Sequence, residues 1–273
     1  MSHEWKDKVV FITGAATGIG ESVVRILLDE GVKHIAILDI AEEAGQSLQA
    51  ELNSKYGNKT KFYRSDVTDE EHFLGILNAV VQEQGGIDVV INNAALMNDS
   101  IGIYKKAIEV NVTALITSTL KAIEIMGKHS GGKGGTVINV SSVAALTQSH
   151  VMPIYFATKS AVLQFSNCIG RPEHFSKTGV RVLTVCFGAT DTALLTDEKL
   201  GTFDKYLESS CLDQLKKGFI FQRKESAAQG LVDSYKKGES GSTWLVVNNL
   251  PVQEISGSVA EAYQILSQNV YRL

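Results

Sequence analysis

A glycine-rich turn between an apolar run and a helical pattern constrains this fold more than any other part of the sequence. Residues 8–12 (KVVFI) are apolar and rich in β-branched side chains, which predicts a buried strand. Residues 13–20 (TGAATGIG) follow directly, and from position 22 to 30 apolar residues recur at helical spacing before Gly31 provides a stop. Strand, glycine-rich turn and helix in this order direct backbone N–H groups and a helix N-terminus at a pyrophosphate.

A second apolar run, residues 34–38, predicts a neighbouring strand that ends on Asp39. Asp39 lies nineteen residues after Gly20, close to the offset of about 20 residues at which an acidic side chain meets an adenosine ribose. A carboxylate accepts hydrogen bonds from both ribose hydroxyls and repels a 2′-phosphate, and the adjacent Ile40 offers no cation. The sequence therefore favours NAD over NADP. The alternative interpretation is a tight turn followed by a loop aspartate, with no ligand.

Tyr155 and Lys159 lie four residues apart, and Ser142 lies thirteen residues before Tyr155. On a helix the two side chains share a face, so the ammonium of Lys159 is expected to favour the phenolate of Tyr155, whose pKa would otherwise be about 10. A serine hydroxyl at the end of a preceding strand could hold a substrate oxygen against the phenol. Alone, a Tyr and a Lys at this spacing are typical of an ordinary helix surface. Beside a dinucleotide-binding turn, they predict a proton-transfer device for hydride transfer.

Further apolar strands alternate with helical periods along the chain. They are expected at residues 62–63, 89–91, 137–140 and 180–185. This alternation predicts a parallel sheet with helices on both faces. Residues 131–135 (GGKGG) fit a turn between a helix and a strand.

Composition narrows the function class. With 26 basic and 30 acidic residues, the chain shows no electrostatic footprint for nucleic acid. The apolar run after the polar first eight residues is only a strand long, so neither a signal peptide nor a membrane span is expected. Cys168, Cys186 and Cys211 lack metal-ligand spacing and are interpreted as reduced packing residues, and the six histidines form no metal motif. We expect a cytoplasmic protein without a bound metal.

The chain resembles the single-domain short-chain dehydrogenases/reductases over residues 8–243. The matching segments are residues 13–20, 66–67, 92–95, 111, 141–142, 155 with 159, and 188–192. Within that family, residues 37–39, 66–68, 134–136 and the stretch around Trp244 are similar to the insect alcohol dehydrogenases and the 15-hydroxyprostaglandin dehydrogenases. The resemblance implies an α/β fold, a Rossmann-type doubly wound parallel sheet in one domain. The cofactor half would span residues 8–140, the catalytic half 141–250 and a tail 250–273.

The resemblance also implies roles for individual residues. The pyrophosphate would be held by Gly14, Thr17, Gly18, Ile19 and Gly20, and the rest of the cofactor by Asp39, Asp66, Val67, Asn93, Gly188, Thr190, Tyr155 and Lys159. Asn111 would interrupt a helix and support a water relay to Lys159, beside the catalytic Ser142 and Tyr155. Two departures from the family pattern are Phe187, where proline is usual, and Ala95, where glycine is usual. They affect the placement of the nicotinamide more than the reacting groups.

The segments expected to line the substrate pocket are largely apolar and contain no arginine: residues 96–97, 143–146, 150–153 and 193–200. This favours an uncharged, apolar alcohol or ketone. Met97 and Met152 would form an adaptable wall, unless they pack in the core. His150 is interpreted as a solvated loop residue rather than a substrate contact, and residues 192–211 suit a mobile lid.

Two further functions stay open beside an alcohol dehydrogenase. The same groups would serve an NADH-dependent carbonyl reductase, and a non-catalytic dinucleotide-binding sensor is the alternative of another class. The helices expected at residues 99–128 and 153–170 are apolar over more than one stripe, so a homodimer or homotetramer is predicted. The tail, with helical spacing at Val259, Tyr263 and Leu266, would cover the pocket or join a neighbour.

Overall fold

The computed structural model describes residues 3–196, 199–204, 217–218 and 220–270. Its centre is a sheet with the strand order β3-β2-β1-β4-β5-β6-β7-β8, in which the first seven strands are parallel and β8 pairs antiparallel with β7. The strands are β1 Val9–Thr13, β2 His34–Asp39, β3 Thr60–Arg64, β4 Val89–Asn92, β5 Gly135–Ser142, β6 Val180–Phe187, β7 Thr243–Val246 and β8 Gln253–Glu254. The predicted parallel sheet is confirmed, but the sequence pattern predicted neither β7 nor the antiparallel edge strand β8.

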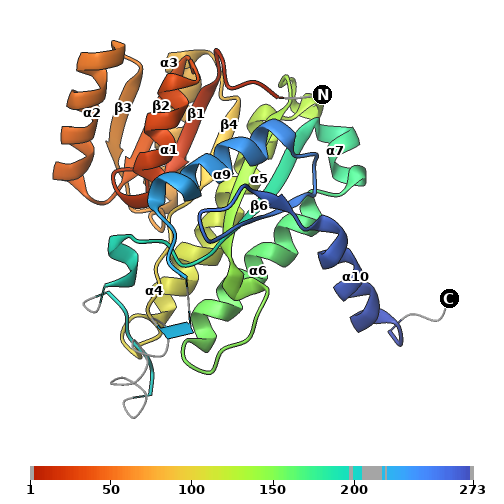
Figure 1. Cartoon of the computed structure of the whole chain (residues 1–273). Coiled ribbons are helices and arrows are strands. Elements are labelled where there is room, and N and C mark those ends of the chain that lie inside the picture. The colour runs from red at the N-terminus through yellow and green to blue at the C-terminus, as the bar shows by residue number, and fades with distance from the viewer. Residues whose placement is uncertain (1–2, 197–198, 205–216, 219, 271–273) are drawn as a thin grey trace.

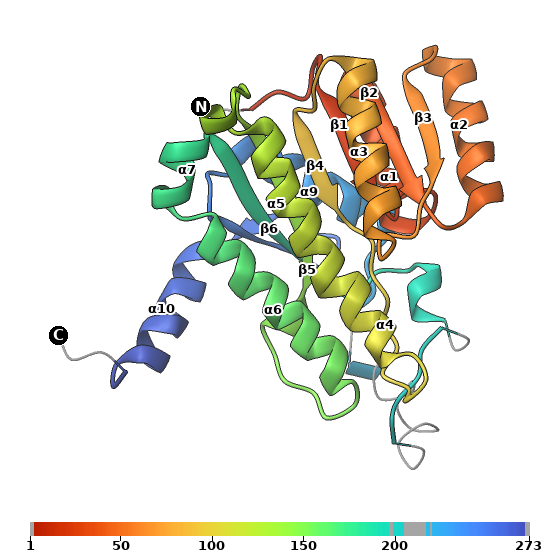
Figure 2. The same ribbon diagram turned by 180° about the vertical axis from the view of Figure 1, so that it is seen from behind.

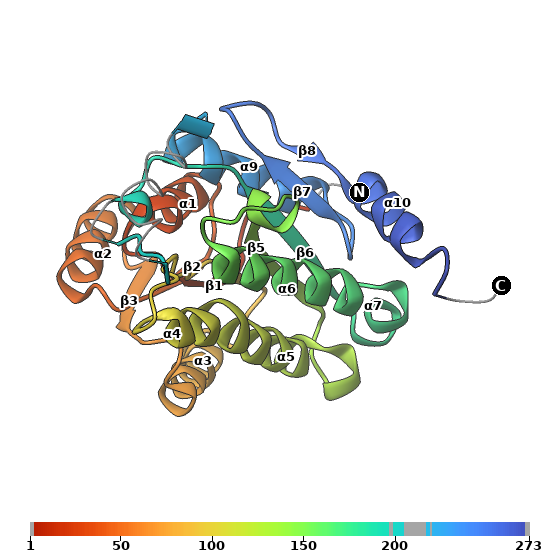
Figure 3. The same cartoon turned by 90° about the horizontal axis from the view of Figure 1, so that it is seen from below.

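Helices cover both faces of this sheet (Figure 1). They are α1 Gly18–Asp29, α2 Glu42–Tyr56, α3 Glu70–Gln84, α4 Tyr104–Ile108, α5 Ala114–Met126, α6 Pro153–Ile169, α7 Pro172–Thr178, α9 Lys224–Lys237 and α10 Ser256–Ser267. Viewed along the sheet, α1 and α9 lie on one side and α3, α5 and α6 on the other (Figure 3). Short helical turns complete the fold: η1 Glu109–Thr113, η2 Lys128–Ser130, η3 Val143–Ala145 and η4 Ala193–Leu195.

Alternate side chains of the strands enter two separate cores. In β1, Val10 and Ile12 pack against α1 and α9, whereas Val9 and Phe11 pack against α3 and α5. Because successive side chains of a strand point to opposite faces, a strand buried on both faces becomes a continuous apolar run. This is why the apolar runs of the sequence predict the strands within one or two residues at each end.

The helix after the glycine-rich turn begins at Gly18, four residues before the start that the apolar spacing predicts. Thr17 is its N-cap, and the first turn is Gly18, Ile19 and Gly20. Hydrophobic periodicity does not register a turn made largely of glycine, so the true start was missed. The consequence is that the N-terminus of α1 lies inside the turn, at the carboxyl end of β1.

The C-terminal helix α10 lies at the edge of the sheet beyond β7 and β8 (Figures 1 and 3). None of its residues lies against the main cleft described below, and none is buried. Of the two placements expected for the tail, covering the pocket of its own chain is therefore wrong for the residues described up to 270, and joining a neighbour stays a prediction. The reason is topological: β7 and β8 carry the chain to the edge of the sheet away from β1.

Candidate active site

A cleft of about 880 Å³ opens at the carboxyl ends of the parallel strands, the edge at which open α/β sheets bind ligands. It brings together nearly all the predicted site residues. Those that line it are Gly14, Thr17, Gly18, Ile19, Asp39, Asp66, Val67, Asn93, Ser142, Tyr155, Lys159, Gly188 and Thr190. Gly20 and Asn111 lie behind this surface, and both act through their neighbours.

The glycine-rich turn has the conformation that a close approach by a ligand requires. Gly14 and Gly18 have φ angles of +63° and +62°, in the left-handed region that favours glycine. A Cβ at Gly20 would lie 2.3 Å from the carbonyl oxygen of Gly14, and a Cβ at Gly14 would lie 2.8 Å from Cα of Ala94. The glycines therefore let the turn, α1 and the end of β4 pack together and expose backbone N–H groups to the cleft.

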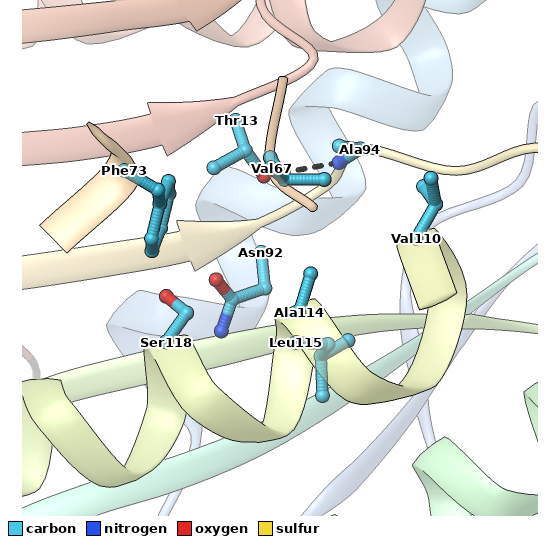
Figure 4. Close-up of a pocket in the computed structure, with 9 residues that line it drawn as sticks. All are labelled: Thr13, Val67, Phe73, Asn92, Ala94, Val110, Ala114, Leu115 and Ser118. Atoms are coloured by element: carbon cyan, nitrogen blue, oxygen red, sulfur yellow. Dashed lines mark hydrogen bonds between the residues drawn. The ribbon is translucent and has the colours of Figure 1, made fainter. Parts of the chain in front are cut away.

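Side chains from β1 and β4 hold this turn in place. Thr13 Oγ1 accepts hydrogen bonds from the N–H groups of Asn93 and Ala94, each at 3.1 Å (Figure 4). The amide of Asn93 donates to the carbonyl oxygens of Thr13 at 3.0 Å and Gly14 at 2.8 Å. Asn93 thus lines the cleft as predicted, and its amide nitrogen fixes the glycine-rich turn.

The carboxylate of Asp39 is held at the end of β2 by two backbone donors. Its oxygens accept hydrogen bonds from the N–H of Ala16 and the N–H of Ala41, each at 3.0 Å. These bonds leave further lone pairs free for hydroxyl donors, because each carboxylate oxygen has two. An anion next to this carboxylate would meet electrostatic repulsion.

Asp66 and Val67 lie at the same end of the cleft. One carboxylate oxygen of Asp66 accepts from the N–H and the hydroxyl of Thr68, and the other lies 3.0 Å from the ammonium of Lys106. Burial raises the pKa of Asp66, but the hydrogen bonds of Thr68 and the charge of Lys106 together lower it below its ordinary value. Asp66 is therefore an anion at neutral pH, and Lys106, which the sequence analysis missed, is its partner at the cleft.

Ser142, Tyr155 and Lys159 converge at the centre of the cleft. Ser142 ends β5, and its hydroxyl donates to the carbonyl oxygen of Phe187 at 3.3 Å. Tyr155 and Lys159 lie on one face of α6, with the Lys159 Nζ 5.8 Å from the centre of the Tyr155 ring. The Nζ donates to the carbonyl oxygen of Val140 at 3.1 Å. The predicted triplet is thus assembled from the end of β5 and the first two turns of α6.

Burial controls the protonation of both residues of α6. It raises the pKa of Tyr155 to about 12, and a hydrogen bond with Ser142 acts in the opposite direction. It lowers the pKa of Lys159 to about 8. The expectation that Lys159 lowers the pKa of Tyr155 is therefore not met in the protein alone. The reason is that desolvation disfavours both charged forms, the phenolate and the ammonium.

Asn111 lies in a π-helical turn, Glu109–Thr113, between α4 and α5. Its side chain is buried, and its amide donates to the carbonyl oxygen of Leu96 at 2.8 Å and to Thr158 Oγ1 at 3.1 Å. The side-chain oxygen of Asn111, Oδ1, accepts a hydrogen bond from the backbone N–H of Leu96 at 2.8 Å. The predicted interruption of the helix is confirmed, since π-helical turns mark such positions. The water relay stays a prediction.

Gly188 and Thr190 follow the end of β6 at the edge of the cleft. Thr190 Oγ1 donates to the carbonyl oxygen of Gly188 at 2.9 Å and accepts from the amide of Gln222 at 3.1 Å. Gln222 also donates to the carbonyl oxygen of Val246 at 2.9 Å. The segment after β6 is thus tied to β7. Phe187 is buried in the core beneath it, which explains how a phenylalanine is accommodated at this position.

The substrate end of the cleft is apolar, as predicted, but its membership differs from the prediction. Residues 96–97, 143–144, 193–195 and 200 line it. Residues 150–153 do not, and Met152 is fully buried behind the wall, packed with Met97, Val151 and Phe156. Hydrophobicity alone cannot separate a wall residue from one that lies behind the wall. His150 is exposed outside the cleft, in agreement with its interpretation as a loop residue.

Other cleft residues escaped the sequence analysis. Phe156 follows Tyr155 on α6 and faces the cleft, and Phe221 closes it from the segment before α9. Asn98 lines it beside Met97. The signal for Phe156 was its position beside Tyr155, whereas nothing local in the sequence marks Phe221. Of the proposed lid, residues 197–198 and 205–211 lie outside the described residues.

A second cavity, of about 10 Å³, lies between β4 and α5 and has room for at most one water (Figure 4). Asn92 and Ser118 point into it, and Ser118 Oγ is buried without a hydrogen-bond partner among the described residues. It is too small for a substrate.

The structure also bears on the cysteines, on metal binding and on membrane-spanning helices. Cys186 is buried, but Cys168 is exposed and is not a packing residue, and Cys211 lies outside the described residues. Over the described ranges, the His, Cys, Asp and Glu side chains form no group of three that could hold a metal ion. Among the helices that the structure describes, none has the length and hydropathy that crossing a bilayer requires.

Comparison with known proteins agrees with this geometry. Residues 8–201 match the short chain dehydrogenase family. The 15-hydroxyprostaglandin dehydrogenase [NAD(+)] of Macaca fascicularis is 34% identical over 203 residues, which cover 74% of this chain and 75% of that protein. Alcohol dehydrogenase 1 of Ceratitis cosyra is 33% identical over 188 residues, covering 68% and 71% respectively.

The fold is also found among solved structures. A 3-ketoacyl-(acyl-carrier-protein) reductase from Brucella melitensis, complexed with NADH, superimposes with a TM-score of 0.75 at 20% identity. The match covers 89% of this chain and 98% of that one. With the glycine-rich turn, the Ser142–Tyr155–Lys159 cluster and the matches over residues 8–201, the chain belongs to the short-chain dehydrogenase/reductase family.

Proposed function

We propose that this protein is an NAD-dependent dehydrogenase that oxidises an uncharged, apolar secondary alcohol and reduces the corresponding ketone in the reverse direction. The observation that carries the proposal is that Ser142, Tyr155 and Lys159 meet in one cleft between a dinucleotide-type turn and an apolar wall. The names of the relatives support it, because they include NAD(+)-dependent and alcohol dehydrogenases.

The residues at the cofactor end fit NAD. The N-terminus of α1 would receive the pyrophosphate, because backbone N–H groups and the helix dipole at a helix N-terminus favour an anion. Gly14 and Gly20 allow the close packing of the turn that places this N-terminus at the cleft. The carboxylate of Asp39 would accept hydrogen bonds from the ribose hydroxyls and repel a 2′-phosphate. When bound, NAD would supply the two-electron acceptor for the carbinol carbon.

The chain's own groups account for the proton. The Ser142 hydroxyl, which lines the same cleft as the phenol of Tyr155, would hold the substrate oxygen beside that phenol. Tyr155 would take the hydroxyl proton during oxidation and return it during reduction. The ammonium of Lys159, with its Nζ 5.8 Å from the centre of the Tyr155 ring, would favour the phenolate that forms during the reaction. The apolar residues around them exclude water from the reacting atoms.

A cofactor screen tests this function. The protein is incubated with secondary alcohols of graded size and either NAD or NADP, and formation of the reduced cofactor is followed. The matching ketones are tested with NADH. We expect turnover with NAD in both directions and weak or no turnover with NADP. Tight NADH binding without turnover of any alcohol or ketone would contradict the proposal and favour the non-catalytic sensor.

A further inference from the structure

The N-terminus of α6, the helix that carries Tyr155, is capped by a residue from another part of the chain. Its N-cap residue, Met152, makes no capping side-chain hydrogen bond in the described structure, and position N1 is Pro153, which has no N–H. The next two N–H groups, those of Ile154 and Tyr155, would be unpaired within the helix. Both donate to the carboxylate of Asp99, at 2.7 and 2.9 Å.

Asp99 is fully buried, which makes this cap unusual among the charged groups of the chain. Burial raises the pKa of its carboxyl group, and the two N–H bonds act in the opposite direction. An aspartate is stabilised at a helix N-terminus by these bonds and by the helix dipole. The cap is specific in geometry, because each oxygen of the carboxylate receives one N–H.

The same two-residue segment also holds the substrate side of the cleft. The backbone N–H of Asp99 donates to the carbonyl oxygen of Gly201 at 2.8 Å, and the amide of Asn98 donates to the carbonyl oxygen of Lys199 at 2.9 Å. A Cβ at Gly201 would lie 2.7 Å from the Asn98 side chain, so the two segments are in tight contact. Lys199 and Leu200 line the cleft.

We propose that Asp99 is a positioning residue for this reaction: it sets the first turn of α6, and thereby Tyr155, and it couples that turn to the segment 199–202 at the substrate end. Asn98 fixes the substrate end of this connection, because its amide binds the backbone of Lys199. When substrate contacts residues 199–200, a shift of their backbone would move Asn98 and Asp99, and through Asp99 the backbone of Tyr155. This inference rests on the proposed function only for its kinetic consequence.

Substituting the two residues separates their roles. Asp99→Asn keeps the shape but offers only one acceptor oxygen, so one of the two N–H groups loses its partner and Tyr155 is no longer fixed. We expect kcat to fall about tenfold or more, with NADH affinity within about twofold of the parent because the glycine-rich turn and Asp39 are untouched. Asn98→Ala should mainly raise KM, since it releases the backbone of Lys199 and leaves both N–H bonds of Asp99 in place.

Asp69→Asn is the matched control. Asp69 caps α3 by accepting from the N–H of His72 at 3.2 Å, and it lies outside the cleft. The same chemical change there should leave kcat and KM unchanged. All rates are expressed per NADH-binding site, so a variant that is merely less stable shows no loss in kcat. If Asp99→Asn does not lower kcat, or Asn98→Ala does not raise KM, the positioning role is contradicted and Asp99 is only a structural cap.

Hydrogen exchange provides a readout that needs no substrate. In Asp99→Asn, amides at the start of α6 and in residues 199–204 should both exchange faster than in the parent, whereas Asp69→Asn should accelerate exchange only in α3. If the parent turns over no alcohol or ketone, the proposed function fails, and the exchange pattern still decides whether the coupling exists. Faster exchange in α6 with no change in residues 199–204 would overturn the coupling.

Discussion

At the residue scale, the cost of burying a charged side chain sets the pKa of Lys159 and the contribution of Lys159 to stability. Lys159 is almost completely buried, and its ammonium donates to the carbonyl oxygen of Val140 and lies 5.8 Å from the centre of the Tyr155 ring. Its pKa falls to about 8, so the ammonium is retained at neutral pH against the cost of desolvation. Strongly shifted pKa values cluster at functional sites, which agrees with the catalytic role proposed above for Lys159.

Lys159→Met should therefore stabilise the protein while abolishing turnover. Near pH 7 the parent holds a buried charge, and removing it should raise the free energy of unfolding by about 2 kcal/mol. The folded-state pKa lies below the unfolded one, so the unfolded chain binds more protons between about pH 8 and 10.5 and the parent gains stability as pH rises through that window. The advantage of the variant should shrink over the same window.

Urea unfolding of both proteins at about pH 7 and pH 9.5 measures this difference. Comparing variant with parent at each pH cancels the titration of all other groups. A variant that is less stable at neutral pH, or an advantage that grows with pH, would contradict the account of Lys159.

Asp39→Ala tests the choice of cofactor at the same scale. The substitution removes the acceptors for the ribose hydroxyls and the repulsion of a 2′-phosphate, so NAD should bind more weakly and NADP relatively better. We expect the preference for NAD, as the ratio of kcat/KM values, to fall by about tenfold or more. A parent that already works better with NADP would show that Asp39 does not select the cofactor.

At the scale of elements, sequence patterns predicted strands β1 to β6 and the order of the site segments, but not β7, β8 or the contacts between side chains of different elements. Residues at strand ends, such as Asp39 and Ser142, were found because the carboxyl edge of a parallel sheet gathers them. Met152 was expected in the wall, with the core as the alternative, and it lies in the core behind the wall. Asp99 was missed, since it caps a helix 55 residues away along the chain. Such contacts between distant segments leave no local periodicity.

The apolar wall formed by Met97, Ala144, Leu194, Leu195 and Leu200 predicts how substrates are ranked. Each additional methylene buried there contributes up to about 0.8 kcal/mol, so kcat/KM should rise with chain length from small to medium apolar secondary alcohols. Leu195→Trp should fill part of this space and lower kcat/KM for the longest alcohols about tenfold, with little effect on the shortest. A steady fall from the smallest alcohol upward in the parent would indicate a small pocket instead.

At the scale of the whole molecule, the outer face of α5 and α6 bears on whether the protein forms an oligomer. Helices α5 and α6 lie side by side on the outside of the sheet (Figure 2). Leu120 of α5 exposes 49% of its surface, and Ile108 at the end of α4 exposes 40%. Because apolar side chains exposed on such a face need a second surface to cover them, the expected homodimer or homotetramer stays a prediction. We expect light scattering at micromolar concentration to give a dimeric or tetrameric mass, and Leu120→Glu to lower it. A monomeric mass for the parent would contradict the prediction.

The central claim is that Tyr155 exchanges a proton with a substrate bound in the main cleft. Tyr155→Phe removes only the phenolic oxygen and leaves the ring, which lies edge-on to Phe156 and belongs to the same buried cluster as Met97. The measurement is turnover of the best alcohol by the parent and by this variant, each at saturating NAD, together with NADH affinity from the same preparations. The account predicts unchanged NADH affinity and turnover reduced by about a thousandfold. Residual turnover above about a tenth of the parent would contradict it, since general acid–base catalysis contributes more than that.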